Sequence, residues 1–202
     1  MTNRSAIQSM NPSPVIRRAT QHDVSFIVAL HRRLSGSLGF MPTEALREHV
    51  DLQHVVIAEE NGDPAAFIVH GALKPTLRIF QAAVHYDLQR RYLGSAILSD
   101  VAARAHACGV SAITLGCRDG LESNAFWSAL RFDLRSVELG GAKRRKMVNR
   151  WQLDLCDRSA FSPGDSLTPA RILRGRPALE HLQEERHASG EHLSRIVRVE
   201  SL

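Results

Sequence analysis

Apolar residues recur along the first 155 residues in two patterns, one typical of strands and one typical of helices. Short apolar runs bounded by turn residues predict strands, and apolar positions three and four residues apart predict helices. The segment 20–34 has the helical spacing. Thr20 and Asp23 have the spacing of a capping box at its start, with the aspartate in place of the usual glutamate.

The predicted strands and helices alternate along the chain. They are a strand at 14–19, helices at 20–34 and 42–50, strands at 54–60, 65–73 and 78–87, a helix from 93 that Gly109 ends, a strand at 111–117, a short helix within 121–132, and two strands within 134–155. This order predicts an α/β fold, in which helices pack on a mixed sheet.

The pattern divides the chain into three parts. Residues 1–13 form a polar segment that we interpret as a flexible leader, and residues 14–155 contain all the predicted strands. Residues 156–202 contain many serine, proline and glycine residues, with apolar residues too sparse for a core of their own. We therefore expect this last part to be a tail, partly disordered or with one helix at 177–189.

Charge, cysteine content and the length of apolar runs limit the kinds of function the chain can have. The chain has 26 Lys and Arg against 21 Asp and Glu, a net charge of +5, which favours anionic ligands without indicating nucleic-acid binding. Three cysteines without CxxC spacing favour a reduced, cytoplasmic protein. No run approaches 18 apolar residues and the histidines have no ligand spacing, so we expect neither a membrane span nor a metal site.

The stretch AAVHYDLQRRYLGSAIL, residues 82–98, changes from the strand pattern to the helix pattern. At the junction lie the five polar or small residues Gln89, Arg90, Arg91, Gly94 and Ser95. A helix start offers unpaired N–H donors and a partial positive charge, so this junction suits a phosphate group. An ordinary surface turn is the alternative.

The junction and the order of elements together resemble the GNAT superfamily of acyl-CoA-dependent N-acyltransferases. Its signature is Gln/Arg-x-x-Gly-x-Gly/Ala after the fourth strand, where backbone amides hold the coenzyme A pyrophosphate. In one alignment Gln89 takes the first position and Gly94 the last, with Tyr92 at the first glycine. In the other alignment Arg91, Gly94 and Ala96 match without a substitution, and the residues alone do not decide between the two.

A second block, SNAFWSALRF, resembles the family's Asn-x-x-aromatic-x-x-x-Gly-Phe segment beside the pantetheine arm. Asn124, Trp127 and Phe132 match it, and Arg131 occupies the customary glycine. The resemblance covers residues 14–155. It implies a central mixed, mostly antiparallel sheet, acetyl-CoA as the co-substrate, and transfer of an acetyl or other short acyl group to a primary amine.

The resemblance also implies a set of site residues. The thioester carbonyl would meet a backbone N–H near Val84, and Trp127 would be a packing wall because it replaces the tyrosine that donates a proton in many relatives. The implied cofactor-binding residues are Val84, Gln89, Arg90, Arg91, Tyr92, Leu93, Gly94, Ser95, Ala96, Asn124 and Trp127.

The proton-transfer candidates come from the strand pattern rather than from the resemblance. Gln81, Ala83 and His85 alternate onto one face of the fourth strand, so His85 is a candidate general base, with an ordinary strand-end histidine as the alternative. Tyr86 is a candidate substitute proton donor, or it packs against the coenzyme.

The acceptor amine, on a small molecule or a protein, is not specified by these motifs. The resemblance implies that two variable parts of the fold choose the acceptor, the segment LSGSLGFMPTEAL at 34–46 and the loop GGAKRRK at 140–146. Lys143, Arg144 and Arg145 follow a Gly-Gly pair and would suit an anionic or nucleic-acid-associated acceptor, although such runs are commonly only solvated. Two alternatives stay open: a degenerate domain that binds acyl-CoA or a partner without turnover, and a nucleic-acid-associated protein. A homodimer also stays open.

Overall fold

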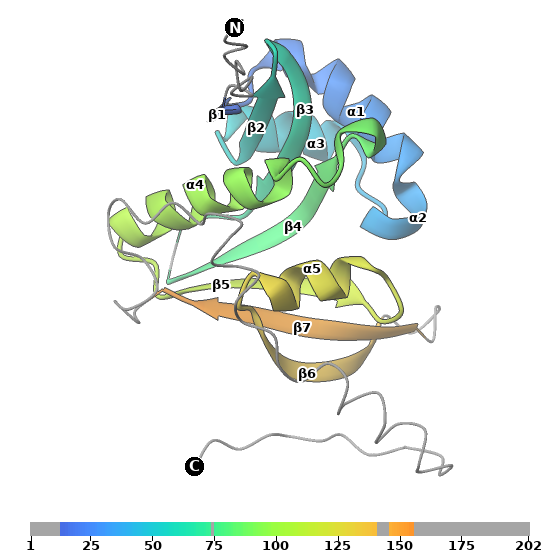
Figure 1. The fold of residues 1–202 in the computed structure, drawn as a ribbon, viewed down its shortest axis with the longest axis vertical. Helices are drawn as coiled ribbons and strands as arrows, with labels where there is room; N and C mark the ends of the chain where they lie inside the picture. Colours follow the sequence, from blue (N-terminus) through green and yellow to red (C-terminus); the bar gives the residue numbers. More distant parts are fainter. Residues whose placement is uncertain (1–12, 74, 141–145, 156–202) are drawn as a thin grey trace, which may run out of the picture.

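A computed structural model describes residues 13–73, 75–140 and 146–155 of the chain. These residues form one seven-stranded sheet with the strand order β1-β2-β3-β4-β5-β7-β6 (Figure 1). The strands are β1 (Val15–Arg18), β2 (Val55–Glu60), β3 (Asp63–His70), β4 (Thr76–Val84), β5 (Ala112–Arg118), β6 (Asp133–Gly140) and β7 (Lys146–Asp154). Neighbouring strands are antiparallel except β4 and β5, which are parallel. The expected α/β fold with a mixed, mostly antiparallel sheet is confirmed.

Helices cover both faces of the sheet (Figure 1). They are α1 (Val24–Arg33), α2 (Ser35–Leu38), α3 (Thr43–Asp51), α4 (Leu93–Ala107) and α5 (Ser123–Ala129), with short 3₁₀ helices η1 (Gln21–Asp23) and η2 (Tyr86–Leu88). On one face, Ile27 of α1 and Leu46 of α3 pack in a buried cluster with Phe67 of β3. On the other face, Ile97 of α4 packs in a second cluster with Ile68 of β3. β3 is therefore buried on both sides, which accounts for its continuous apolar run.

The structure differs from the sequence-based expectation at two places beside the site. β4 ends at Val84, whereas the pattern predicted a strand as far as residue 87. The segment predicted as a break after the first helix contains a further short helix, α2. The Leu34 carbonyl accepts hydrogen bonds from the N–H groups of Ser37 and Leu38, and Gly39 then ends the helix with a φ of 76°.

A buried aspartate joins the first strand to the first helical turn. Asp23 is 4% exposed, and its two carboxylate oxygens accept hydrogen bonds of 2.7 and 2.8 Å from the Arg17 guanidinium. The backbone N–H and hydroxyl of Thr20 also donate to Asp23, so the predicted capping box is confirmed. Arg17 further donates to Glu59 of β2 at 2.6 Å. The hydrogen bonds from Arg17 lower the pKa of Asp23 to about 2.

Candidate active site

The parallel strand pair separates partway along its length. β4 and β5 pair through residues 76–79 and 112–115. Beyond this point β4 stays paired with β3 as far as Val84, and β5 stays paired with β7 as far as Arg118. The two strands therefore diverge toward their carboxyl ends, and backbone groups that would otherwise join them face the gap between them.

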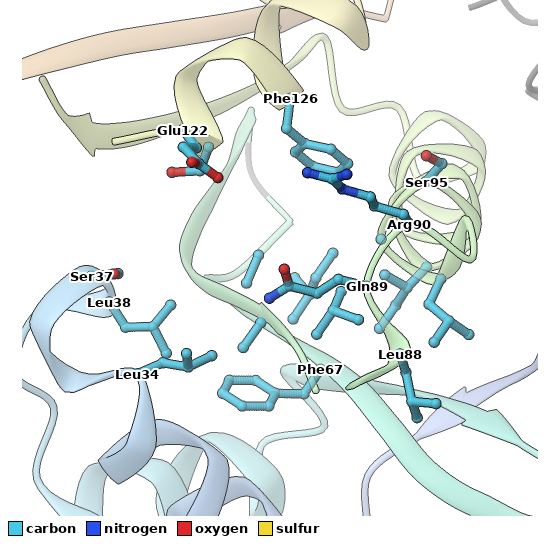
Figure 2. A pocket seen from close by; sticks show the side chains of 18 of the residues that line it. Leu34, Ser37, Leu38, Phe67, Leu88, Gln89, Arg90, Ser95, Glu122 and Phe126 are labelled. Carbon is cyan, nitrogen blue, oxygen red and sulfur yellow. The ribbon is translucent and has the colours of Figure 1, made fainter. Parts of the chain in front are cut away.

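A cleft of about 750 Å³ occupies this gap (Figure 2). Its walls come from α1 and α2, from β3 and β4, from the turn that precedes α4, and from α4 and α5. The lining residues are Leu34, Ser37, Leu38, Phe67, Ile68, Ala82, Ala83, Val84, Leu88, Gln89, Arg90, Tyr92, Leu93, Gly94, Ser95, Ile97, Leu121, Glu122, Ser123, Phe126 and Trp127.

The N-terminus of α4 forms one end of the cleft. Tyr92 precedes the helix in the left-handed conformation, with a φ of 63°. The first regular hydrogen bond of the helix runs from the Ala96 N–H to the Tyr92 carbonyl, so the three amides before it have no partner within the helix. These three amides belong to Leu93, Gly94 and Ser95, all of which line the cleft. This end therefore combines N–H donors, the positive end of a 15-residue helix and the nearby Arg90.

Gly94 lies beside Phe126 of α5 and Val84 of β4. A Cβ atom on Gly94 would lie 3.1 Å from Cζ and 3.3 Å from Cε2 of the Phe126 ring, and 3.6 Å from a methyl group of Val84. A side chain at this position would thus displace the Phe126 ring or project into the cleft. The absence of a Cβ keeps the start of α4 open to a ligand.

These features agree with a sequence comparison. The model of the acetyltransferase (GNAT) family matches residues 24–131, which include the strand-to-helix junction and all of the second block except Phe132. The chain belongs to the GNAT acetyltransferase family. No curated protein sequence matches the chain significantly.

Solved structures of GNAT proteins share the fold. Ard1 from Thermoplasma volcanium superposes with a TM-score of 0.63 at 14% identity, over 70% of this chain and 97% of that chain. The ribosomal-protein-S18-alanine N-acetyltransferase from Escherichia coli gives 0.60 at 19% identity, over 70% and 94%. YncA from Salmonella typhimurium, determined with acetyl-CoA, gives 0.60 at 20% identity, over 74% and 98%.

The chain departs from the GNAT pattern at two customary glycines while keeping a glycine-like backbone at both. Tyr92 has a φ of 63° and Arg131 a φ of 64°, the left-handed region that glycine enters most readily. Gly94 instead lies within α4. This geometry favours the alignment that starts at Gln89, because it pairs the first glycine of the pattern with a left-handed residue.

Replacing Arg131 by glycine is expected to stabilise the protein. A non-glycine residue in the left-handed region carries strain of about 1–2 kcal/mol, which glycine removes. Glycine also gives the unfolded chain more conformational entropy, which offsets about 0.5–1 kcal/mol of this gain. Thermal unfolding of Arg131→Gly should therefore show a gain of about 0.5–1 kcal/mol, or roughly 2 °C. The control Ala103→Gly, at an exposed position within α4, should lose about 1 kcal/mol. A loss in both variants would contradict this expectation.

The structure brings most of the predicted cofactor-binding residues to one cleft. Those that line it are Val84, Gln89, Arg90, Tyr92, Leu93, Gly94, Ser95 and Trp127. Arg91, Ala96 and Asn124 were predicted with them and do not line it. Arg91 forms an ion pair of 3.3 Å with Glu60 of β2, and the Ala96 N–H is engaged within α4.

Asn124 holds the turn between β5 and α5 together. Its side-chain NH₂ donates to the carbonyls of Arg118 and Leu121, each at 2.9 Å. Its side-chain oxygen accepts from Asn149 at 3.1 Å and from the Trp151 indole at 3.0 Å. The Asn124 side-chain amide thus joins α5 to β5 and β7 through hydrogen bonds. These bonds fix the position of α5 and of its cleft-lining aromatic residues.

The predicted catalytic pair, His85 and Tyr86, lies just outside the lining of the cleft. β4 ends at Val84 and η2 begins at Tyr86, so the alternation that would have directed His85 along the strand face stops one residue earlier. The His85 ring stacks on Tyr86 with 5.0 Å between ring centroids, and its Nδ1 lies 3.8 Å from Asp87. Tyr86 is 55% exposed, and the Arg33 guanidinium lies over its ring.

The predicted acceptor residues Lys143, Arg144 and Arg145 lie outside the described residues. Two residues that line the cleft, Phe126 and Glu122, were not singled out from the sequence (Figure 2). Leu34 and Leu38 also line the cleft, and they belong to the α1–α2 segment. The sequence pattern predicted a break between two helices in the α1–α2 segment, and the family resemblance implied that residues 34–46 help to choose the acceptor. The position of this segment beside β4 depends on packing between distant parts of the chain.

Other candidate groups show no second reactive centre in the described part of the chain. Burial raises the pKa of the Cys117 thiol, whose sulfur lies 3.2 Å from the Ser123 hydroxyl. The rings of His54 and His70 lie 5.5 Å apart beside a separate hollow, and burial lowers the pKa of both. Within the described ranges, no three His, Cys, Asp or Glu side chains could hold a metal ion, and no helix is long and apolar enough to cross a membrane.

Proposed function

We propose that the protein is an N-acyltransferase that moves an acetyl or other short acyl group from acyl-CoA directly to a primary amine. The observation that carries this proposal is the cleft along β4, on the side where β5 has separated, which opens beside the unpaired amides of α4. The family supports it, as do related structures determined with acetyl-CoA or coenzyme A. A cytoplasmic location, favoured by the free thiols of Cys108 and Cys117, belongs to the same proposal.

The residues at the α4 end fit a pyrophosphate group. The amides of Leu93, Gly94 and Ser95 would donate to phosphate oxygens, because helix geometry leaves them without an acceptor. Arg90 would add charge-assisted hydrogen bonds. Gly94 provides the space, since a Cβ there would crowd Phe126 and Val84.

A backbone donor in the middle of the cleft suits the thioester carbonyl. The His85 N–H bonds to the Ala65 carbonyl on the β3 side of β4. Successive amides of a strand point to opposite edges, so the Val84 N–H points toward the side on which β5 has separated. A preorganised donor of this kind stabilises the oxyanion that develops on the carbonyl during acyl transfer.

The activated thioester comes from acyl-CoA. The amine nitrogen forms a C–N bond to the acyl carbon as the C–S bond breaks. The electron pair of the C–S bond leaves with sulfur, and the amine proton is released. The role of this chain is to align the two reactants and exclude water. Phe126 and Trp127 contribute an apolar wall for this purpose. His85 as general base and Tyr86 as proton donor stay predictions.

The proposal is tested in two steps. Isothermal titration with acetyl-CoA measures binding, and a thiol-release assay with a panel of primary amines measures transfer. Binding together with amine-dependent thiol release is the expected result. A folded protein that does not bind acetyl-CoA would contradict the proposal at its first step.

Replacing Trp127 by phenylalanine is expected to preserve most of the activity. Trp127 is 6% exposed, lines the cleft and packs edge-on against Phe126 and Phe132. An indole N–H is a hydrogen-bond donor only and does not supply a proton at neutral pH, so its loss should lower kcat by less than about tenfold. Thiol-release kinetics of Trp127→Phe check this. A fall of several orders of magnitude at unchanged acetyl-CoA affinity would assign the indole a direct role.

A protein that binds acyl-CoA without turnover is the second candidate. The observation in its favour is that both predicted proton-transfer residues, His85 and Tyr86, lie outside the lining of the cleft. In that case acetyl-CoA would bind and no amine in the panel would release thiol beyond the rate of hydrolysis. Neither a homodimer nor a nucleic-acid partner is part of the proposal.

A further inference from the structure

The two charged side chains that line the cleft come from different walls. Arg90 belongs to the turn before α4, at the end that suits the pyrophosphate. Glu122 belongs to the start of α5, and Figure 2 shows its carboxylate on the side that faces Ser37 and Leu38 of α2. Among the described lining residues, Arg90 is the only cation and Glu122 the only acid. The end of the cleft with Arg90 therefore suits an anion, and the end with Glu122 suits a cation.

The Glu122 carboxylate has no role in holding the fold. It makes no hydrogen bond or ion pair with the described part of the chain, and although Glu122 is the N-cap residue of α5, its side chain makes no capping hydrogen bond. Asn124, two residues later, already secures this turn through both of its side-chain atoms. The carboxylate is therefore free to bind a ligand at this mouth of the cleft.

The wall next to this mouth is apolar. Leu34 and Leu38 are partly buried and lie with Phe67 along the side of the cleft away from α4 (Figure 2). Ser37 is exposed at the same edge. A ligand that enters here meets one carboxylate and several hydrocarbon side chains, and among the described lining residues the only cation is at the opposite end.

We propose that this mouth receives the acceptor, and that the acceptor is a primary amine on an apolar carbon skeleton without a carboxylate beside the nitrogen. Glu122 binds the ammonium form, and Leu34 and Leu38 contact the apolar group. This inference rests on the proposed acyltransferase function and specifies its substrate class. It differs from the anionic acceptor suggested by residues 143–145, and the two expectations predict opposite preferences.

Steady-state kinetics with saturating acetyl-CoA test the proposal, with 2-phenylethylamine, methylamine and L-glutamate as acceptors. In Glu122→Gln the KM for 2-phenylethylamine should rise roughly tenfold, and the dissociation constant for acetyl-CoA should stay within about twofold. The control Glu44→Gln removes a carboxylate from α3, outside the cleft, and should leave both values unchanged. The Glu122 effect should shrink with added salt, because exposed charges are screened.

Leu38→Ala separates the apolar contact from the charge. It should raise the KM for 2-phenylethylamine and leave the KM for methylamine unchanged, because only the first amine reaches this wall. Quenching of tryptophan fluorescence by 2-phenylethylamine in the presence of coenzyme A gives a readout independent of turnover, since Trp127 lines the cleft. This quenching should weaken in Glu122→Gln and persist in Glu44→Gln.

Three results would overturn the inference while leaving the acyltransferase proposal intact. They are equal 2-phenylethylamine constants for the wild-type protein and Glu122→Gln, a wild-type preference for L-glutamate over 2-phenylethylamine, and no binding of 2-phenylethylamine beside coenzyme A. Loss of acetyl-CoA binding in the wild-type protein would instead overturn both.

Discussion

Replacing Gly94 by glutamate is expected to abolish acetyl-CoA binding in a protein that still folds. The new side chain would start 3.1 Å from the Phe126 ring and would place a negative charge beside the unpaired amides of α4. Repulsion between the new carboxylate and the pyrophosphate, together with the lost space, should weaken acetyl-CoA binding by at least about 100-fold. Isothermal titration with acetyl-CoA measures the change, and far-ultraviolet circular dichroism confirms the fold.

Two further variants identify the cause. Gly94→Gln has nearly the same size without the charge, so it should bind acetyl-CoA more tightly than Gly94→Glu and more weakly than the wild-type protein. Ala103→Glu adds the same charge to an exposed position later in α4 and should bind normally. Unchanged affinity in folded Gly94→Glu would show that the pyrophosphate does not lie at this helix start.

Replacing Asp23 by alanine is expected to lower the free energy of unfolding by about 3 kcal/mol. The buried carboxylate accepts two hydrogen bonds from Arg17 and two from Thr20, and its loss leaves the guanidinium with only part of its partners. Arg17 is one-third exposed, so water offsets some of this cost. Chemical denaturation at neutral pH measures the difference, and Glu48→Ala, an exposed position in α3, should change little.

The Asp23 effect should depend on pH in a defined direction. The pKa of Asp23 is lowered from 3.8 to about 2 by Arg17, so the ionised carboxylate stabilises the folded state above pH 4. This stabilisation is lost as the pH falls from 4 through 2, because the folded protein then takes up the proton. The wild-type protein should therefore approach Asp23→Ala in stability at low pH. A difference that stays constant down to pH 2 would assign the effect to packing alone.

Local sequence determined the elements and the start of α4. Apolar spacing identified all seven strands and the long helices, because burial on one or both faces of a sheet imposes that spacing. The capping pair Thr20 and Asp23 was recognisable because both partners lie within one helical turn. The junction at 89–95, which the sequence indicated as a candidate phosphate site, coincides with the N-terminus of α4, because the signals of a helix start also lie within a few residues.

Conformation at single residues was only partly visible in the sequence. The GNAT pattern has glycine at the positions of Tyr92 and Arg131. Because this chain has other residues there, its sequence gives no sign of a left-handed backbone at these positions. The structure places both residues at a φ near 63°, where the surrounding turn imposes the geometry on a side chain that does not prefer it.

The chemistry of the cleft was decided by contacts between distant residues. The gap exists because β4 and β5 pair over only four residues while each keeps its other neighbour. Arg91 turns away from the cleft because it meets Glu60, 31 residues earlier, and Asn124 is engaged because it meets Trp151, 27 residues later. Glu122 and Leu38 come to one cleft from positions 84 residues apart in the sequence. Spacing along a chain reports which side chains share a helix turn or strand face, but only the packing of whole elements decides which of them face one another.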